Sequence, residues 1–149
     1  MKENPGRLIS ILYRKSQMFW CQLLKEYEVS AAEYPVLMIL YRQDGRTQEN
    51  VVSELAIDKS AITRVVKSLE EKGFIERKKD EVDKRCNRIY LTEKGHLLKK
   101  PIEKGIMEWN GILQKDMSNE ESDEVMRLLN QMVDNIQEQS EKKEKRKDQ

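Results

Sequence analysis

The stretch "DEVDKRCNRIYLTEKG", residues 80–95, runs from a cluster of charged side chains into a short apolar segment that ends in residues typical of a helix start. The apolar segment "RIYL" (88–91) and the earlier run "FIERKK" (74–79) both carry the aromatic and β-branched residues that strands favour. Thr92 is a preferred helix N-cap. The sequence therefore predicts a β-hairpin with a long, charged tip, followed directly by a helix.

Two short helices are predicted ahead of this hairpin, in "QENVVSELAIDKSAITRVVKSLEEKGFI" (48–75), with the link "ID" between them. Asp58 is the expected N-cap of the second helix and Gly73 its expected end. The second helix has an apolar stripe and a basic, hydroxyl-bearing stripe. The apolar stripe comprises Ile62, Val65, Val66 and Leu69, and the polar stripe comprises Ser60, Thr63, Arg64 and Lys67. Two helices of this kind predict a helix-turn-helix, whose second helix offers hydroxyl and guanidinium groups suited to base edges and phosphates.

A long helix and a shorter one are predicted on the N-terminal side of this unit. Apolar residues at three- and four-residue spacings predict an amphipathic helix over residues 4–27. Ser30 and Glu33 form a capping box for a second helix, over residues 31–43.

The C-terminal side is also predicted to be helical. We expect a helix from Thr92 to about residue 115, kinked at Pro101 and weakened by Gly105 and Gly111, so that it forms a bent connector. A last amphipathic helix is expected from about Ser118. Residues 141–149 contain no apolar side chain, so we expect this tail to be disordered. The predicted fold class is mainly α.

Composition limits the classes of protein to consider. The chain has 149 residues, enough for one domain, and 37% of them are charged, which suits long helices with solvated faces. The formal net charge is only +1, but residues 59–88 carry ten cationic and six acidic side chains, so the middle of the chain is basic. Local charge decides binding to a polyanion, and DNA therefore remains a candidate partner. Two cysteines are too few for a disulfide scaffold, and no apolar run is long enough for a membrane span or signal peptide, so we expect a cytoplasmic protein without a membrane partner.

The motifs of this chain resemble the MarR family of bacterial transcription regulators. The spacing D-x-R-x(5)-L-T-x-x-G, formed by Asp83, Arg85, Leu91, Thr92 and Gly95, is similar to that family's signature. The segment "DKSAITRVVKSLEEKGFIER" (58–77) resembles the family's recognition helix and first wing strand. The resemblance extends over residues from about 5 to 140.

The resemblance implies a winged helix-turn-helix lobe over residues 31–91 and a dimerisation lobe formed by residues 4–27 and 92–140. A homodimer would read an inverted repeat in a double-stranded DNA operator, most simply as a ligand-responsive repressor, although the sequence does not exclude an activator. Ser60, Thr63 and Arg64 would lie at the major groove. Arg85 would enter the minor groove from the wing tip, held by Asp83, and Lys67 and Lys84 are candidates for phosphate contacts.

Related regulators bind small lipophilic or phenolic effectors between their two lobes. Residues of suitable chemistry here are Tyr13, Met18, Trp20, Met38 and Trp109. Ordinary core packing is the better interpretation for each of them individually. Cys21 is expected to be packed, whereas Cys86 is expected to be exposed, with a thiolate favoured by neighbouring arginines; a redox role is the less favoured interpretation of either.

Two other classes of function were weighed against DNA binding. A winged helix can serve as a protein–protein interaction module without DNA specificity, but the basic, hydroxyl-bearing stripe argues for DNA. An enzyme is disfavoured because the sequence shows no glycine-rich phosphate loop, metal-ligand cluster or nucleophile–base pair, and we expect no metal and no cofactor. His96, the only histidine, is expected on the surface.

Overall fold

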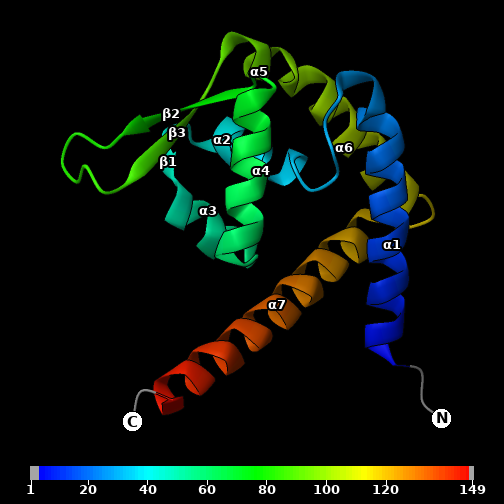
Figure 1. The fold of residues 1–149 in the computed structure, drawn as a ribbon. Coiled ribbons are helices and arrows are strands. Elements are labelled where there is room, and N and C mark those ends of the chain that lie inside the picture. The colour runs from blue at the N-terminus through cyan, green and yellow to red at the C-terminus, as the bar shows by residue number, and fades with distance from the viewer. Residues whose placement is uncertain (1–3, 148–149) are drawn as a thin grey trace. The chain divides into compact units, whose positions relative to one another are not determined.

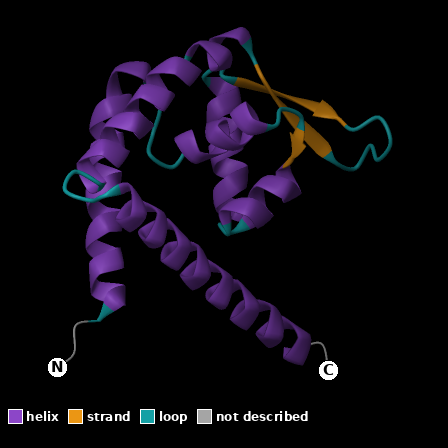
Figure 2. Cartoon of the chain, turned by 180° about the vertical axis from the view of Figure 1, so that it is seen from behind, coloured by secondary structure: helices purple, strands orange, loops and turns teal. Residues whose placement is uncertain are grey.

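The computed structural model describes residues 4–147, which form helices and one small sheet (Figures 1 and 2). The elements in chain order are α1 (Pro5–Leu24), a 3-10 turn (Lys25–Tyr27), α2 (Tyr34–Arg42), β1 (Arg46–Thr47), α3 (Gln48–Leu55), α4 (Lys59–Glu71), β2 (Ile75–Lys79), β3 (Asn87–Leu91), α5 (Glu93–Leu97), α6 (Lys99–Leu113) and α7 (Asn119–Lys147). They divide into two units, Met1–Trp109 and Asn110–Gln149, and α6 runs from the first into the second. The prediction of a mainly α fold is confirmed.

The helix-turn-helix and the hairpin form as predicted in the first unit. Helix α3 begins at the N-cap Thr47, whose hydroxyl accepts from the backbone N–H of Asn50, and α4 begins at Asp58, whose carboxylate accepts from Ala61. Between these helices Ala56 adopts a left-handed conformation with φ of 53°. Strands β2 and β3 pair in antiparallel register over their full lengths. Together they make a helix-turn-helix followed by a wing.

A continuous core supports this unit. The largest fully buried side chains include Phe74, Leu24, Leu37, Ile62, Leu69 and Ile89, which come from α1, α2, α4, β3 and the start of the hairpin. Burying side chains of this size contributes roughly 1.5–3 kcal/mol each, measured against leaving them exposed. The core therefore fixes α4 and the wing to a common scaffold.

The sheet has a third strand that the sequence did not predict. Strand β1 pairs with β3, giving the order β1-β3-β2, with Arg46 opposite Ile89 and Thr47 opposite Arg88. A strand of two residues has no periodicity to detect, and only the distant partner strand stabilises it.

Two predicted helices differ from the structure in extent. Ser30 and Glu33 make the reciprocal hydrogen bonds of a capping box, at 3.2 and 2.9 Å, yet α2 itself starts only at Tyr34. The helix predicted from Thr92 to about 115 is interrupted at Leu98, which separates α5 from α6. The break lies three residues before Pro101, which itself stands in the first turn of α6, so the predicted bend in this segment is present but falls ahead of the proline.

Glycines in the first unit mark close approaches of the backbone. A Cβ added at Gly95 would overlap the carbonyl oxygen of Phe74, so α5 can lie against the start of the hairpin only with glycine at this position. Gly105 is buried in α6, where a Cβ would overlap side chains of α1. We expected Gly105 to weaken a connector, but in the structure its small size allows two helices to pack closely.

The second unit consists of the end of α6 and the long helix α7. Ser118 caps α7 through a reciprocal pair of hydrogen bonds with Glu121, at 3.1 and 2.8 Å. The structure continues α7 as helix to Lys147, which differs from the disordered tail predicted for residues 141–149. Residues 141–147 are mostly glutamate and lysine, and these side chains favour helix without any apolar burial. Residues 148–149 of that predicted tail lie outside the described part of the chain.

Candidate nucleic-acid interface

The polar stripe of α4 is exposed, opposite a buried apolar stripe. Ser60, Thr63, Arg64 and Lys67 all lie on the accessible side, whereas Ile62, Val66 and Leu69 are buried. The guanidinium of Arg64 makes no hydrogen bond or ion pair with any residue from 4 to 147, and Lys67 has only a loose ion pair with Glu71 at 3.9 Å. These cationic groups are therefore accessible to an anionic partner.

The hydroxyl of Thr63 is already engaged in hydrogen bonds within the protein. It donates to the carbonyl oxygen of Lys59 at 2.8 Å and accepts from Nε2 of Gln48, also at 2.8 Å. Gln48 lies at the start of α3, so this contact joins the two helices of the helix-turn-helix. Sequence reasoning missed Gln48, because a contact between side chains fifteen positions apart leaves no periodic signal.

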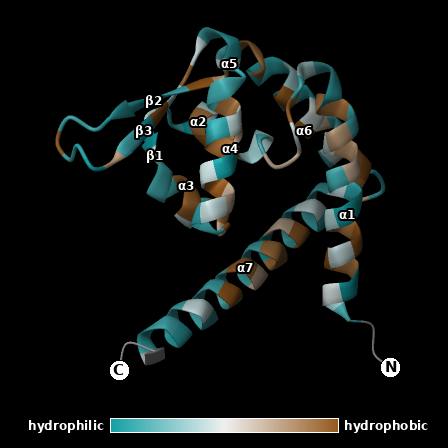
Figure 3. Cartoon of the chain, in the orientation of Figure 1, coloured by the Kyte–Doolittle hydropathy of each residue, from teal (hydrophilic) through white to brown (hydrophobic). Residues whose placement is uncertain are grey.

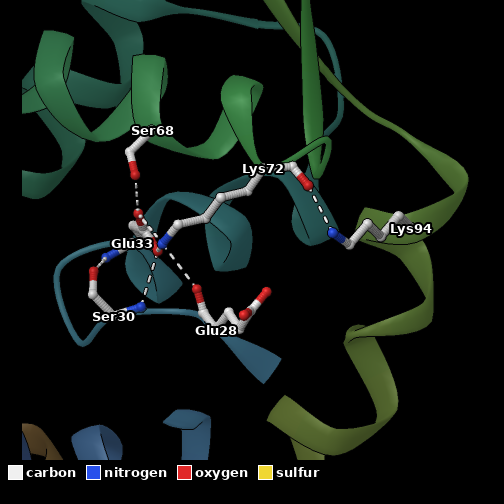
Figure 4. A network of polar contacts seen from close by, with 6 residues as sticks. All are labelled: Glu28, Ser30, Glu33, Ser68, Lys72 and Lys94. Atoms are coloured by element: carbon white, nitrogen blue, oxygen red, sulfur yellow. Dashed lines mark hydrogen bonds and ion pairs between the residues drawn. The ribbon is translucent and has the colours of Figure 1, made fainter. Parts of the chain in front are cut away.

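A buried carboxylate anchors the C-terminal part of α4 (Figure 4). Glu33 is only 3% exposed, and its carboxylate accepts from the hydroxyl of Ser68 at 2.6 Å and from Nζ of Lys72, which is 2.9 Å from each oxygen. Burial alone would raise the pKa of Glu33, but hydrogen bonds from Ser68, Ser30 and Lys72, with the charge of Lys72, outweigh it and hold the pKa below its ordinary value. The carboxylate thus stays ionised and ties the last two turns of α4 to the start of α2.

The C-terminal end of α4 is held by residues that follow the wing. Lys94 Nζ donates to the carbonyl oxygen of Lys72 at 2.7 Å, and the hydroxyl of Thr92 donates to the carbonyl oxygen of Gly73 at 2.6 Å. Gly73 has φ of +80°, a left-handed conformation that glycine adopts without steric cost. The carbonyl groups of the two residues that follow the last turn of α4 are thereby satisfied, which fixes this end of the helix.

The wing presents Arg85 at its tip. The side chain of Arg85 is 94% exposed, and Asp83 Oδ1 accepts from its backbone N–H at 3.1 Å and lies 3.4 Å from its Nε. Asp83 therefore lies where we predicted a group that shapes the loop. Lys84 is exposed beside it.

A second ion pair, which the sequence analysis missed, closes the base of the wing loop. Arg88 Nε donates to Asp80 Oδ2 at 2.8 Å, and another guanidinium nitrogen of Arg88 donates to the carbonyl oxygen of Gly45 at 2.7 Å. The pKa of Asp80 lies below its ordinary value, chiefly because its carboxylate accepts from the backbone N–H of Val82 and also because of Arg88. Arg88 thus links the wing to the segment ahead of β1. The sequence does contain a signal of this ion pair, because Asp80 and Arg88 have opposite charges and stand at the two ends of the hairpin loop.

The expectations for the two cysteines were wrong. Cys21 is exposed rather than packed. Cys86 is half-buried, and burial together with the neighbouring charge of Asp83 raises the pKa of its thiol instead of lowering it. Its Sγ lies 3.6 Å from Asp83 Oδ2, so the acidic neighbour outweighs the adjacent arginines. The thiolate is therefore disfavoured.

A hollow of about 340 Å³ separates α3 from the wing. Its walls include Gln48 and Ser53 from α3, Lys59 from the start of α4, and Arg85 and Asn87 from the wing. None of the five predicted ligand-pocket residues lines it. Glu49 of α3 also lines it, so the hollow carries two cationic side chains and one acidic side chain.

The predicted ligand-pocket residues fall into different environments. Trp20 is buried, and its ring stacks on Tyr34 with 4.2 Å between centroids, so it is a core residue. Met38 is half-buried against the same core, and Trp109 contacts Phe19 at a centroid distance of 5.0 Å. Tyr13 and Met18 are exposed on α1, so neither is a core residue of the chain.

The described part of the chain has neither a metal-binding cluster nor a membrane-spanning helix. Within residues 4–147, no group of three or more His, Cys, Asp and Glu side chains is placed to hold a metal ion. Over the same range no helix has both the length and the apolar character needed to cross a bilayer. His96 is exposed in α5.

A helix-turn-helix with an exposed cationic face, followed by a wing with an arginine at its tip, defines the winged-helix class of DNA-binding proteins. Residues 29–87 match the MarR family. The chain is 34% identical to a MarR transcriptional regulator from Methanosarcina mazei Go1 whose crystal structure superposes with a TM-score of 0.84, and the match covers 89% of this chain and 96% of that one. This protein therefore belongs to the MarR family of transcription regulators.

Two further solved structures resemble the chain. A MarR family transcriptional regulator from Listeria monocytogenes, crystallised with a 26mer DNA, is 26% identical, with a TM-score of 0.87 and coverage of 91% of this chain and 90% of that one. The PcaV regulator from Streptomyces coelicolor, solved in complex with its natural ligand, shares the fold at 24% identity, with a TM-score of 0.79 and coverage of 88% and 92%.

Proposed function

We propose that this MarR-family regulator reads a specific double-stranded DNA operator, with α4 in the major groove and the wing in the adjacent minor groove. The observation that carries the proposal is the pair of arginines without a strong intramolecular partner, Arg64 on α4 and Arg85 at the wing tip. An exposed guanidinium is suited to base edges in the major groove and to the negative potential of a narrow minor groove. Ser60, Lys67 and Lys84 would add contacts to the sugar-phosphate backbone.

We further propose that two copies of the chain form the reading unit. Figure 3 shows hydrophobic positions along both α1 and α7. On α1 the side chains of Leu8, Ile9 and Leu12 are each 47% exposed. On α7 the exposed apolar residues are Met126, Leu128, Leu129, Met132, Val133 and Ile136, which recur along one helix at spacings of three and four. Apolar stripes of this extent usually mark an interface, and a homodimer would cover them. Its two-fold axis implies an inverted repeat with half-sites about one helical turn apart.

The proposed mode of action is repression that a small lipophilic or phenolic ligand relieves. PcaV was solved with a natural ligand, which supports a search for an effector of this chain. Tyr13, Met18, Trp20, Met38 and Trp109 remain the candidate contacts, with Trp20 the least accessible of them. Any effector must bind the DNA-competent and DNA-incompetent arrangements with different affinity, because equal affinity shifts no equilibrium. The proposed activity is binding of DNA and effector without catalysis. The proposed location is the cytoplasm.

The test is selection of binding sites from random duplex DNA, followed by salt titrations of the selected site. Wild type is expected to enrich an inverted repeat and to lose affinity steeply with salt, as phosphates regain counterions. Arg64→Ala and Arg85→Ala should each weaken binding by roughly tenfold or more, the order expected for a lost groove contact. Arg14→Ala removes an exposed arginine of α1 and serves as the matched control.

Two results would contradict the proposal. If neither arginine variant binds more weakly than Arg14→Ala, then α4 and the wing do not read DNA in this manner. If no sequence is enriched with or without candidate effectors, the winged unit serves another purpose, of which protein–protein interaction is the alternative that the fold allows.

A further inference from the structure

The contact between Gln48 and Thr63 changes which group on α4 is free to recognise a base. A threonine hydroxyl has one proton, and that of Thr63 is donated to the carbonyl oxygen of Lys59. One lone pair of the Thr63 hydroxyl oxygen accepts a hydrogen bond from the Gln48 amide. Thr63 therefore has no hydrogen-bond donor left for DNA. The carboxamide of Gln48, by contrast, keeps its oxygen and one N–H without a hydrogen-bond partner among residues 4–147.

The position of Gln48 directs this carboxamide toward the DNA side of the unit. Thr63 belongs to the exposed stripe of α4, together with Ser60 and Arg64, so an amide bonded to Thr63 Oγ1 lies at the same face. Gln48 also lines the hollow between α3 and the wing, whose walls include the cationic side chains of Lys59 and Arg85. A DNA strand held between α4 and the wing would pass these groups.

We propose that Gln48 determines specificity for an adenine in each half-site and that Thr63 is a positioning residue for its side chain. This inference rests on the proposed function and adds a base-reading residue outside the recognition helix. A carboxamide can accept from adenine N6 and donate to adenine N7, a pairing that no other base edge in the major groove offers. Because Nε2 donates a hydrogen bond to Thr63 Oγ1, the amide group cannot rotate by 180° without losing that hydrogen bond. Its donor and acceptor directions are thus set before DNA arrives, which reduces the entropy lost on binding.

The experiment measures base preference rather than affinity alone. The wild-type site is found by selection, every position of one half-site is replaced by each other base in turn, and binding constants are measured for wild type, Gln48→Ala, Thr63→Val and Thr63→Ser. Valine keeps the β-branched shape of threonine but cannot accept a hydrogen bond from the Gln48 amide, whereas serine keeps the hydroxyl group that accepts it. Gln22→Ala, at an exposed glutamine of α1, controls for the loss of a carboxamide elsewhere.

The proposal expects wild type to prefer A·T at one position by about fivefold or more, the lower end of the range for a two-bond base contact. Gln48→Ala should abolish the preference at that position and leave the other positions unchanged. Thr63→Val should weaken the preference at the same position, Thr63→Ser should retain it, and Gln22→Ala should match wild type.

Four results would overturn the proposal. Equal weakening of all sequences by Gln48→Ala, with a shallower salt dependence, would mean that Gln48 contacts phosphate only. Loss of preference at different positions in the Gln48 and Thr63 variants would mean that they do not act as a pair. A preference unaffected by Gln48→Ala would remove Gln48 from recognition while the proposed function stood, whereas failure of wild type to select any sequence would remove both.

Discussion

The Glu33–Lys72 ion pair makes a quantitative prediction about how α4 is held. Replacing Lys72 with methionine keeps the length of the side chain but removes the ammonium group, which donates to both Glu33 oxygens and to the carbonyl oxygen of Glu28 at 2.8 Å. Breaking a buried ion pair by removing one partner costs about 3–5 kcal/mol. The Lys72 side chain is 34% exposed, so water reaches it and we reduce the expected loss of unfolding free energy to about 2–3 kcal/mol.

The assay is urea unfolding followed by the helical circular dichroism signal, at neutral pH and at equal protein concentrations. Lys67→Met is the matched control, because it makes the same substitution in the same helix at an exposed ion pair with 3.9 Å between charges. An exposed pair of this kind should change the unfolding free energy by no more than about 0.5 kcal/mol. Equal losses of unfolding free energy in Lys72→Met and Lys67→Met would refute the anchoring role of Lys72.

The same pair has a characteristic pH dependence. The pKa of Glu33 is lower in the folded chain than its ordinary value of 4.5, so its contribution to stability is complete above that value. The contribution is lost as the pH falls through the lower, folded-state pKa. In Lys72→Met the burial of Glu33 remains without the ammonium, and the pKa of Glu33 should rise. The difference between wild type and Lys72→Met should therefore narrow in acid; a constant difference would show that charge is not the cause.

Four further changes have expected outcomes. Gly95→Ala should lower the melting temperature, because overpacking typically destabilises a protein by about 1–3 kcal/mol. Gly111→Ala should raise the melting temperature, because Gly111 has open space around it and alanine is more stable than glycine in a helix by about 0.5–1 kcal/mol. Shifts of the same sign in the two variants would contradict the close packing at Gly95. Ile136→Glu should halve the mass measured by light scattering, because it places a charge in the proposed dimer interface, and an unchanged mass would exclude α7 from that interface. In a chain without its other cysteine, Asp83→Asn should speed alkylation of Cys86 by lowering the pKa of its thiol, and an unchanged rate would show that Asp83 does not control it.

The features predicted correctly from sequence are those that neighbouring residues determine. Asp58 and Thr92 each cap a helix within three residues of their own position, so their roles are visible in a short window. The start of the last helix near Ser118 was predicted from the acidic residues that follow it, although the cap made by Ser118 itself was not. The hairpin was predictable for the same reason, since its two strands are neighbours in the chain. The family signature then identified the order of the elements, and the fold agrees with it.

The features that were missed depend on partners far along the chain. Strand β1 exists only because β3 pairs with it, and Glu33 is buried as a charged residue only because Lys72 and Ser68 come from another helix. The hydrogen bond from Gln48 to Thr63 likewise requires α3 and α4 to be packed first. The DNA contacts assigned to Ser60, Thr63, Arg64, Lys67, Asp83, Lys84 and Arg85 remain predictions, because contacts with a partner depend on that partner.

The separation of anchor and reading face on α4 has a consequence for how such a regulator can evolve. Ser68 and Lys72 hold the end of the helix through Glu33, while Ser60 and Arg64 lie nearer its start, are exposed and make no hydrogen bond to Glu33. Substitutions at the outward positions can therefore accumulate without loss of folding, and some of them will suit a different stretch of promoter. New regulatory targets become accessible to a duplicated copy by point mutation alone, with no need to rebuild the scaffold that presents the helix.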